Sequence, residues 1–139
     1  MPGTGIYNST KFAVEGMSEA LSAELACFDI KVILIEPGPF RTDFGESLVV
    51  APENPAYQES SSSLTREYIT QLHKKNQAGD PIKAAQIMIK LVGMENPPLR
   101  MLLGNGAIER LQGKLKTQTE EFEQYEDLAR SADYELPTA

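Results

Sequence analysis

The chain has 139 residues, of which 41% are hydrophobic and 24% are charged, as is ordinary for one globular domain. Its formal net charge of −7 argues against a nucleic-acid or anionic membrane partner, because no basic stripe is present to neutralise phosphates. One cysteine, Cys27, cannot form an internal disulfide, and no apolar run approaches the roughly 20 residues of a membrane span. We therefore expect a cytoplasmic protein with no leader segment and no membrane contact.

The chain opens with a predicted helix over residues 6–28, followed by a predicted strand over residues 30–36. The strand reads "IKVILIE", and its apolar residues are nearly continuous rather than alternating. Strands that are buried on both faces have this pattern, and such strands are typical of parallel α/β sheets. Pro37-Gly38-Pro39 ends the strand abruptly.

Residues 43–79 form the least regular segment of the sequence. A serine run precedes "LTREYITQLHKKNQ", in which Leu64, Tyr68 and Leu72 indicate a short amphipathic helix. A linker is one interpretation of this segment, but the apolar helix favours an insertion that packs on another part of the chain. His73 lies beside two lysines and is predicted to be a surface residue rather than a catalytic base.

The remaining elements are a helix, a short strand and a long helix. Asp80 and Pro81 form a good helix start for residues 81–92, and Gly93 is a plausible end. A second apolar strand is predicted over residues 99–103 and an acidic helix over residues 107–132. The order indicates an α/β fold, although two strands are too few for an independent parallel sheet.

The first helix has two faces of different character. At 100° per residue, one stripe collects Tyr7, Lys11, Val14, Met17, Leu21, Leu25 and Phe28. We expect that stripe to pack on the sheet. On the other side, small residues recur at spacings of three and four: Ser9, Ala13, Gly16, Ala20 and Ala23. This small-residue ridge permits close approach of another helix, whereas the alternative is that it simply faces water.

The motif "YNSTK", the helix after it, and the buried strand closed by "PGPFRTDF" together resemble the short-chain dehydrogenase/reductase family. The segments "PIKAAQIMIKLV" and "PPLRMLLG" look like the last crossover helix and last strand of that family. The resemblance implies that the whole chain is the C-terminal part of one Rossmann-like doubly wound parallel sheet, with residues 43–79 as a substrate lid.

The resemblance also implies an activity, in which Tyr7 and Lys11 are the catalytic pair. Tyr7 would be the general acid/base of an NAD- or NADP-dependent oxidoreductase that interconverts an alcohol and a carbonyl. A phenol alone is poorly matched to proton transfer at neutral pH, and the Lys11 ammonium would favour the phenolate. Lys11 would in addition hydrogen-bond the nicotinamide ribose. The simpler interpretation is that the Lys11 side chain extends past Tyr7 into solvent at the end of the helix and has no catalytic role.

The turn after the first strand would be the other part of the cofactor site. By resemblance, Pro37 and Gly38 form a wall of the nicotinamide pocket, and Phe40 and Thr42 meet the carboxamide. Ligands of open α/β sheets bind outside the carboxyl ends of strands, which agrees with that position. Without the upstream pair, Pro37 and Gly38 would be an ordinary turn and Thr42 a helix cap.

Several parts of the family pattern are absent from these residues. The glycine-rich turn that cradles pyrophosphate, the residue that separates NAD from NADP, and the catalytic serine have no counterpart. We therefore expect a fragment, and the alternative function is a non-catalytic module that pairs with other chains through the small-residue ridge and the acidic last helix. One cysteine and one histidine give no zinc constellation, so no metal site is predicted.

Overall fold

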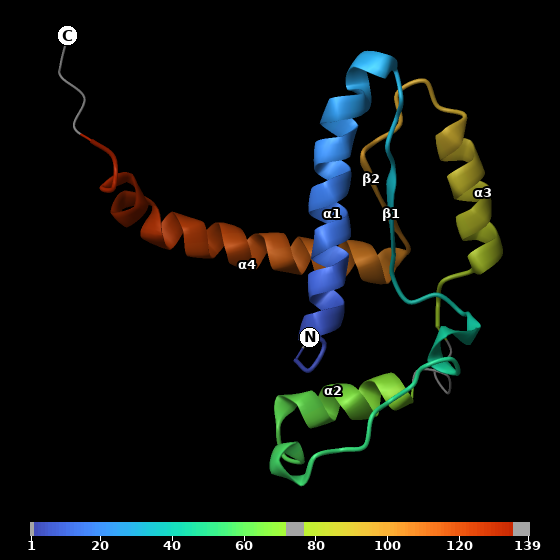
Figure 1. The fold of residues 1–139 in the computed structure, drawn as a ribbon, viewed down its shortest axis with the longest axis vertical. Coiled ribbons are helices and arrows are strands. Elements are labelled where there is room, and N and C mark those ends of the chain that lie inside the picture. Colours follow the sequence, from blue (N-terminus) through green and yellow to red (C-terminus); the bar gives the residue numbers. More distant parts are fainter. Residues whose placement is uncertain (1, 72–76, 135–139) are drawn as a thin grey trace.

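A computed structural model describes residues 2–71 and 77–134 of the chain. In chain order its helices and strands are α1 (Gly5–Leu25), β1 (Leu34–Pro37), α2 (Ser61–Thr70), α3 (Pro81–Val92), β2 (Arg100–Leu103) and α4 (Asn105–Arg130). Short 3₁₀ turns follow α1 and punctuate the segment between β1 and α2. Figure 1 shows α1 and α3 on opposite sides of the two strands, with α4 extending away from them.

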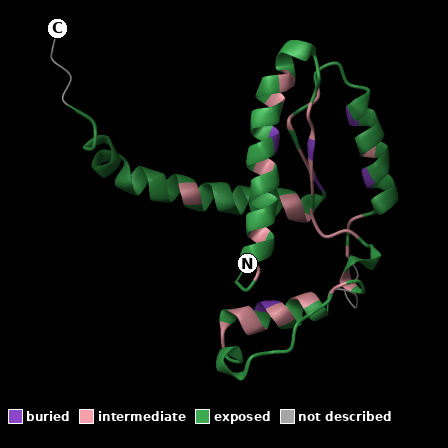
Figure 2. Ribbon diagram, in the orientation of Figure 1, coloured by how far each residue is buried: buried purple, intermediate pink, exposed green. Residues whose placement is uncertain are grey.

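The two strands form a parallel sheet in which Leu34 pairs with Arg100 and Pro37 pairs with Leu103. Parallel neighbours need a crossover, and here α3 provides it. The buried apolar residues of the described chain come from these three elements: Leu34, Ala84, Leu91 and Leu103 (Figure 2). The predicted α/β fold is thereby confirmed, with its small core between α3 and the sheet.

The first strand is shorter than the sequence predicts. We predicted residues 30–36, but the ladder begins at Leu34, whose amide donates to the Leu99 carbonyl over 2.7 Å. β2 offers partners only from that point, so the preceding apolar residues have no strand neighbour within the described ranges. The pattern of apolar residues in a sequence predicts which residues are buried, but a strand also requires a neighbouring strand to which it can hydrogen-bond.

The third helix agrees with its predicted bounds because its end signals are local. The Asp80 carboxylate accepts hydrogen bonds from the amides of Ile82 and Lys83, over 2.9 and 3.4 Å. Pro81 occupies the first turn, where its missing amide proton costs nothing. The predicted last strand and last helix also exist, each shifted by one or two residues at its ends.

The predicted buried face of α1 is wrong. Tyr7, Met17 and Phe28 are 54%, 65% and 70% exposed, and the most buried residue of the helix is Ser18, at 9%. The helix is turned so that Glu15, one turn before Ser18, reaches Arg100 on β2. Glu15 and Ser18 therefore lie on the side of α1 that meets the rest of the described chain.

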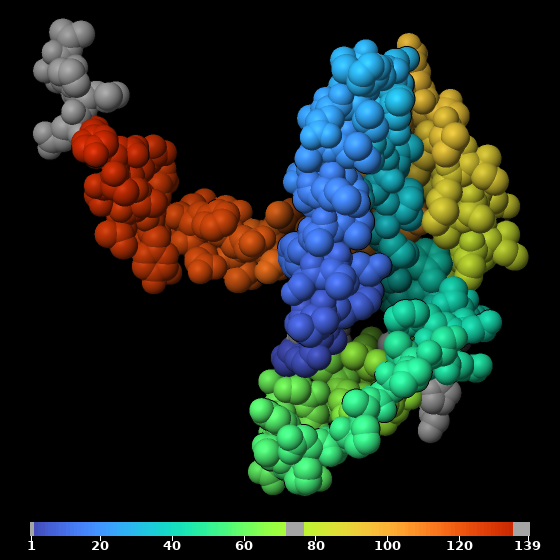
Figure 3. All heavy atoms as spheres, viewed as in Figure 1, coloured from blue at the N-terminus to red at the C-terminus, as the bar shows by residue number. Residues whose placement is uncertain are grey.

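The small-residue ridge of α1 is exposed along its length. A Cβ added at Gly16 would meet nothing within 4 Å, so no described segment packs there. Its role as a helix contact stays a prediction. Figure 3 shows α4 leaving the rest of the molecule as a single helix. None of the described helices combines the length and apolar character needed to cross a bilayer.

Candidate active site

Tyr7 and Lys11 lie on neighbouring turns at the beginning of α1. The Lys11 Nζ atom is 5.6 Å from the centre of the Tyr7 ring, within the range of a cation–π contact. Both side chains are exposed, and within the described residues neither the phenol oxygen nor the ammonium makes a hydrogen bond or ion pair. The two side chains are therefore adjacent and exposed, and their catalytic role stays a prediction.

Gly38 follows β1 where the chain passes the beginning of α4. Its amide donates to the Leu103 carbonyl over 2.9 Å, which continues the ladder one residue beyond the strand. A Cβ at this position would come within 2.9 Å of the Ala107 amide nitrogen, so only glycine fits without a shift. Glycine at this position therefore permits α4 to pack closely against the turn at the carboxyl end of the sheet, the position at which open α/β sheets bind ligands.

Phe40 is held by Gly79, the last residue of the segment predicted as the substrate lid. Gly79, just before α3, forms an isolated parallel bridge with it, and the Gly79 amide donates to the Pro39 carbonyl over 3.1 Å. A Cβ at Gly79 would lie only 2.6 Å from the Phe40 ring, so that ring covers the glycine directly. The only sequence signal for this contact is the glycine immediately before the Asp80-Pro81 helix start.

Thr42 caps the short 3₁₀ turn Asp43–Gly45, as the simpler of its two interpretations predicts. Its hydroxyl oxygen accepts a long hydrogen bond of 3.4 Å from the Phe44 amide. A threonine hydroxyl retains a proton to donate when its oxygen accepts, so a cap does not exclude contact with a ligand.

The segment predicted as a lid lies at the same end of the molecule as Tyr7. A Cβ at Gly3 would lie 3.1 Å from the Ser62 Cβ atom, which places the beginning of α2 against the turn that precedes α1. Figure 1 shows α2 beyond the first turn of α1 and the carboxyl end of β1. The expected amphipathic helix exists, but its Leu64 is 71% exposed, and Leu72 and His73 lie outside the described residues.

Arg100 is a central contact that the sequence did not reveal. Its guanidinium donates to Glu15 and Glu19 of α1, each over 3.0 Å, and lies 3.7 Å from Glu36 of β1. Burial, and then the nearby Glu15 charge, raise the pKa of Glu36, while Arg100 opposes that shift. The one sequence feature that could have indicated a basic partner is Glu36, an acidic residue at the end of an apolar strand.

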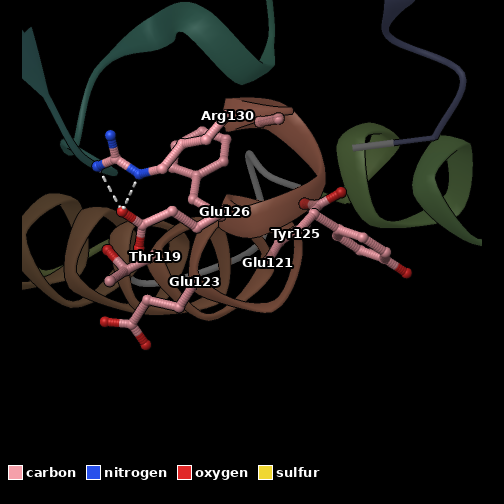
Figure 4. Close-up of a pocket in the computed structure, with 8 residues that line it drawn as sticks. Thr119, Glu121, Glu123, Tyr125, Glu126 and Arg130 are labelled. Atoms are coloured by element: carbon pink, nitrogen blue, oxygen red, sulfur yellow. Dashed lines mark hydrogen bonds and ion pairs between the residues drawn. The ribbon is translucent and has the colours of Figure 1, made fainter. Parts of the chain in front are cut away.

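Two hollows in the described part of the chain lie away from Tyr7 and Lys11. A hollow on the C-terminal half of α4 is lined by α4 residues only, and the Glu126–Arg130 pair lies on its flank (Figure 4). One helix surface cannot enclose a ligand. In the described part of the chain no cluster of histidine, cysteine or acidic residues could hold a metal ion.

Comparison with known proteins supports the family resemblance indicated by the motif that begins at Tyr7. The family model described as short chain dehydrogenase matches residues 1–53. A short-chain dehydrogenase from Streptomyces avermitilis, whose structure is solved, superposes with a TM-score of 0.77 at 35% identity, over 94% of this chain and 47% of that one. The chain belongs to the short-chain dehydrogenase/reductase family.

Curated relatives agree with this assignment. Oxidoreductase BOA17 of Botryotinia fuckeliana is 38% identical over 78% of this chain, and 3-ketodihydrosphingosine reductase of Bacteroides thetaiotaomicron is 35% identical over 75% of it. In both cases the chain spans 39% of the relative's length. The oxidoreductase activity that these relatives' names state is therefore a proposal for this chain.

Proposed function

We propose that this chain is the C-terminal half of a single NAD- or NADP-dependent domain that interconverts an alcohol and a carbonyl. The observation that carries the proposal is the pair on α1, with the Lys11 ammonium 5.6 Å from the Tyr7 ring. Both groups are exposed on the first turns of α1, which begins at the same end of the molecule as the carboxyl end of β1. A phenol and a cation one turn apart are what proton transfer to a substrate oxygen requires.

The residues present fit the nicotinamide end of the cofactor. Lys11 would donate hydrogen bonds to the ribose, and the turn at Gly38 lies at the carboxyl end of β1, where open α/β sheets bind ligands. The positions proposed to contact the cofactor are Tyr7, Lys11, Pro37, Gly38, Phe40 and Thr42. The nicotinamide ring, when bound, accepts or gives the hydride. Tyr7 exchanges the proton with the substrate oxygen, and Lys11 stabilises the phenolate that this leaves.

The proposed substrate is an alcohol or carbonyl compound whose apolar part contacts the described residues of the predicted lid. This segment exposes apolar side chains at the end of the molecule where Tyr7 lies; Val50 and Tyr57 are 37% and 60% exposed. The Bacteroides relative's name makes a long-chain ketone one candidate. The single exposed Cys27 is our basis for proposing a reducing, cytoplasmic compartment.

The isolated chain should bind cofactor weakly, because most of the family's cofactor contacts belong to the glycine-rich turn. The test therefore joins this chain to the N-terminal part of the Streptomyces short-chain dehydrogenase, which is 35% identical over the shared region. Oxidation of NADH and NADPH is then followed with a panel of aldehydes and ketones that includes 3-ketodihydrosphingosine. A folded chimera that binds NADPH or NADH and reduces no carbonyl would contradict the proposal.

A further inference from the structure

The last helix carries an apolar stripe that nothing in the described chain covers. Its members recur at alternating spacings of three and four residues, with Gln118 in one core position: Ile108, Leu111, Leu115, Gln118, Phe122 and Tyr125. We call this set the α4 stripe. The apolar members are between 37% and 69% exposed, and Phe122 is the most exposed of them. This spacing is that of the core positions of a coiled coil.

Only the first turn of α4 is anchored to the rest of the molecule. The Ala107 amide lies against Gly38, and the position of a Cβ on Gly106 is 3.1 Å from the Pro39 ring. Beyond that turn the helix runs free (Figures 1 and 3). A helix of 26 residues with one apolar side requires a partner, because isolated helices gain little from propensity alone.

The charges along α4 are divided between its two halves. Residues 109–116 carry three cations and one acid, whereas residues 120–127 carry five acids and no cation. Two copies of this helix side by side in the same direction would bring like charges together. In the opposite direction, the basic half of each copy meets the acidic half of the other, so the helix is electrostatically complementary to itself when antiparallel.

We propose that α4 pairs with α4 of a second copy of this chain, antiparallel, through the α4 stripe. In the register that buries every apolar member, Ile108 faces the partner's Tyr125 and Leu111 faces the partner's Phe122. Leu115 faces the partner's Gln118, and two-fold symmetry repeats each contact. Gln118 is half-buried, and one polar core residue fixes register.

The same register makes a specific charge pair beside the core. Lys114 flanks the stripe opposite the partner's Glu121, and symmetry supplies this pair twice. Within one helix these residues are seven apart, about 10 Å along the axis, so they cannot pair with each other. In a parallel pair the two residues would remain that far apart. The Lys114–Glu121 contact therefore distinguishes the antiparallel arrangement.

Charge-swap variants of the full chain, followed by sedimentation velocity over a concentration series, test the pairing. Lys114→Glu and Glu121→Lys should each raise the dimer dissociation constant about tenfold, since each disrupts two symmetric contacts. The double variant should return to within about threefold of the parent, because the pairs are re-formed with exchanged signs. The control Asp127→Lys changes the net charge as Glu121→Lys does, but lies on the outer side of α4, and should leave the constant unchanged.

Phe122→Glu should abolish the dimer, and because Phe122 is 69% exposed, the variant should fold normally. A chain that is monomeric throughout, a dimer insensitive to Phe122→Glu, or a charge-swap double as weak as its single variants would overturn the proposal. The first of these results is the one expected if another segment or a different protein covers the stripe.

Spin-label distances provide a readout that does not depend on affinity. In a Cys27→Ser background, labels at Thr117→Cys, next to the two-fold axis, should lie close together. Labels at Glu109→Cys should lie farther apart by about 22 Å along the helix axis, given a rise of 1.5 Å per residue. Equal distances at both positions would indicate parallel helices, and two long distances would indicate association elsewhere. Either result would overturn the proposal.

Discussion

Arg100 on β2 donates a hydrogen bond from Nε to Glu15 Oε2 on α1 over 3.0 Å, although 85 residues separate the two in sequence. The same guanidinium reaches Glu19 and approaches Glu36, and its own pKa is raised, first by its hydrogen bond to Glu19. One cation therefore joins α1, β1 and β2. Its partners Glu15 and Glu19 lie one and two turns beyond Lys11 on the same helix.

Replacing Arg100 with methionine should destabilise the fold, because three carboxylates would then face one another without a cation. Arg100 is 40% exposed, so we expect a modest loss of about 1–2 kcal/mol in the free energy of unfolding. Urea unfolding followed by circular dichroism measures it. The matched control is Arg130→Met, which breaks only the exposed pair with Glu126 on α4 and should cost about 0.3–0.5 kcal/mol. Equal losses in the two variants would show that Arg100 has no special structural role.

Glu36 makes stability depend on pH. Because burial raises its pKa, the folded state binds this proton more tightly than the unfolded state does. The contribution of Glu36 to stability is therefore present at low pH and is lost as pH rises through the raised pKa. Glu36→Gln should be more stable than the parent at pH 7, and the difference should shrink as pH falls through that range. Thermal melts of both proteins across pH 4–8 test this, and a difference that grows toward low pH would show the opposite sign.

Gly38→Ala should destabilise the turn at the carboxyl end of β1. The new Cβ would lie 2.9 Å from the Ala107 amide nitrogen, so α4 or the turn must move, at a cost of about 1–3 kcal/mol. Gly113→Ala in the middle of α4 is the control, because a Cβ there meets nothing within 4 Å. That change should stabilise the helix by up to about 1 kcal/mol. Opposite signs in the two unfolding curves would support the close approach at Gly38.

The sequence predicted well those features whose signals are local. Asp80 and Pro81 mark the start of α3 whatever surrounds it, and the Tyr7–Lys11 spacing places both residues on adjacent turns. Features that depend on distant partners were missed. The start of β1 depends on where β2 can pair, and the contact of α1 with Arg100 joins residues that are far apart in sequence. Gly79 escaped notice because a glycine before a helix has many interpretations.

The small-residue ridge of α1 is proposed as a second helix contact between copies of the chain. Its members are exposed, and Gly16 is open to solvent within the described structure. Gly16→Leu combined with Ala20→Leu should weaken association by overpacking that contact. Ultracentrifugation in a Phe122→Glu background separates this surface from the α4 stripe. A folded variant whose oligomeric state does not change would eliminate the ridge as an interface.

We propose that Tyr7 transfers the proton, and that Lys11 both stabilises the Tyr7 phenolate and hydrogen-bonds the ribose. The most direct measurement is turnover and cofactor affinity for Tyr7→Phe and Lys11→Met in the chimera with the Streptomyces N-terminal part. For Tyr7→Phe we predict a kcat lowered by about two to four orders of magnitude with nearly unchanged NADPH or NADH affinity. Lys11→Met should lower both, because it removes the charge beside the phenol and the donor to the ribose. A Tyr7→Phe protein that retains near-parental kcat at neutral pH would contradict the account.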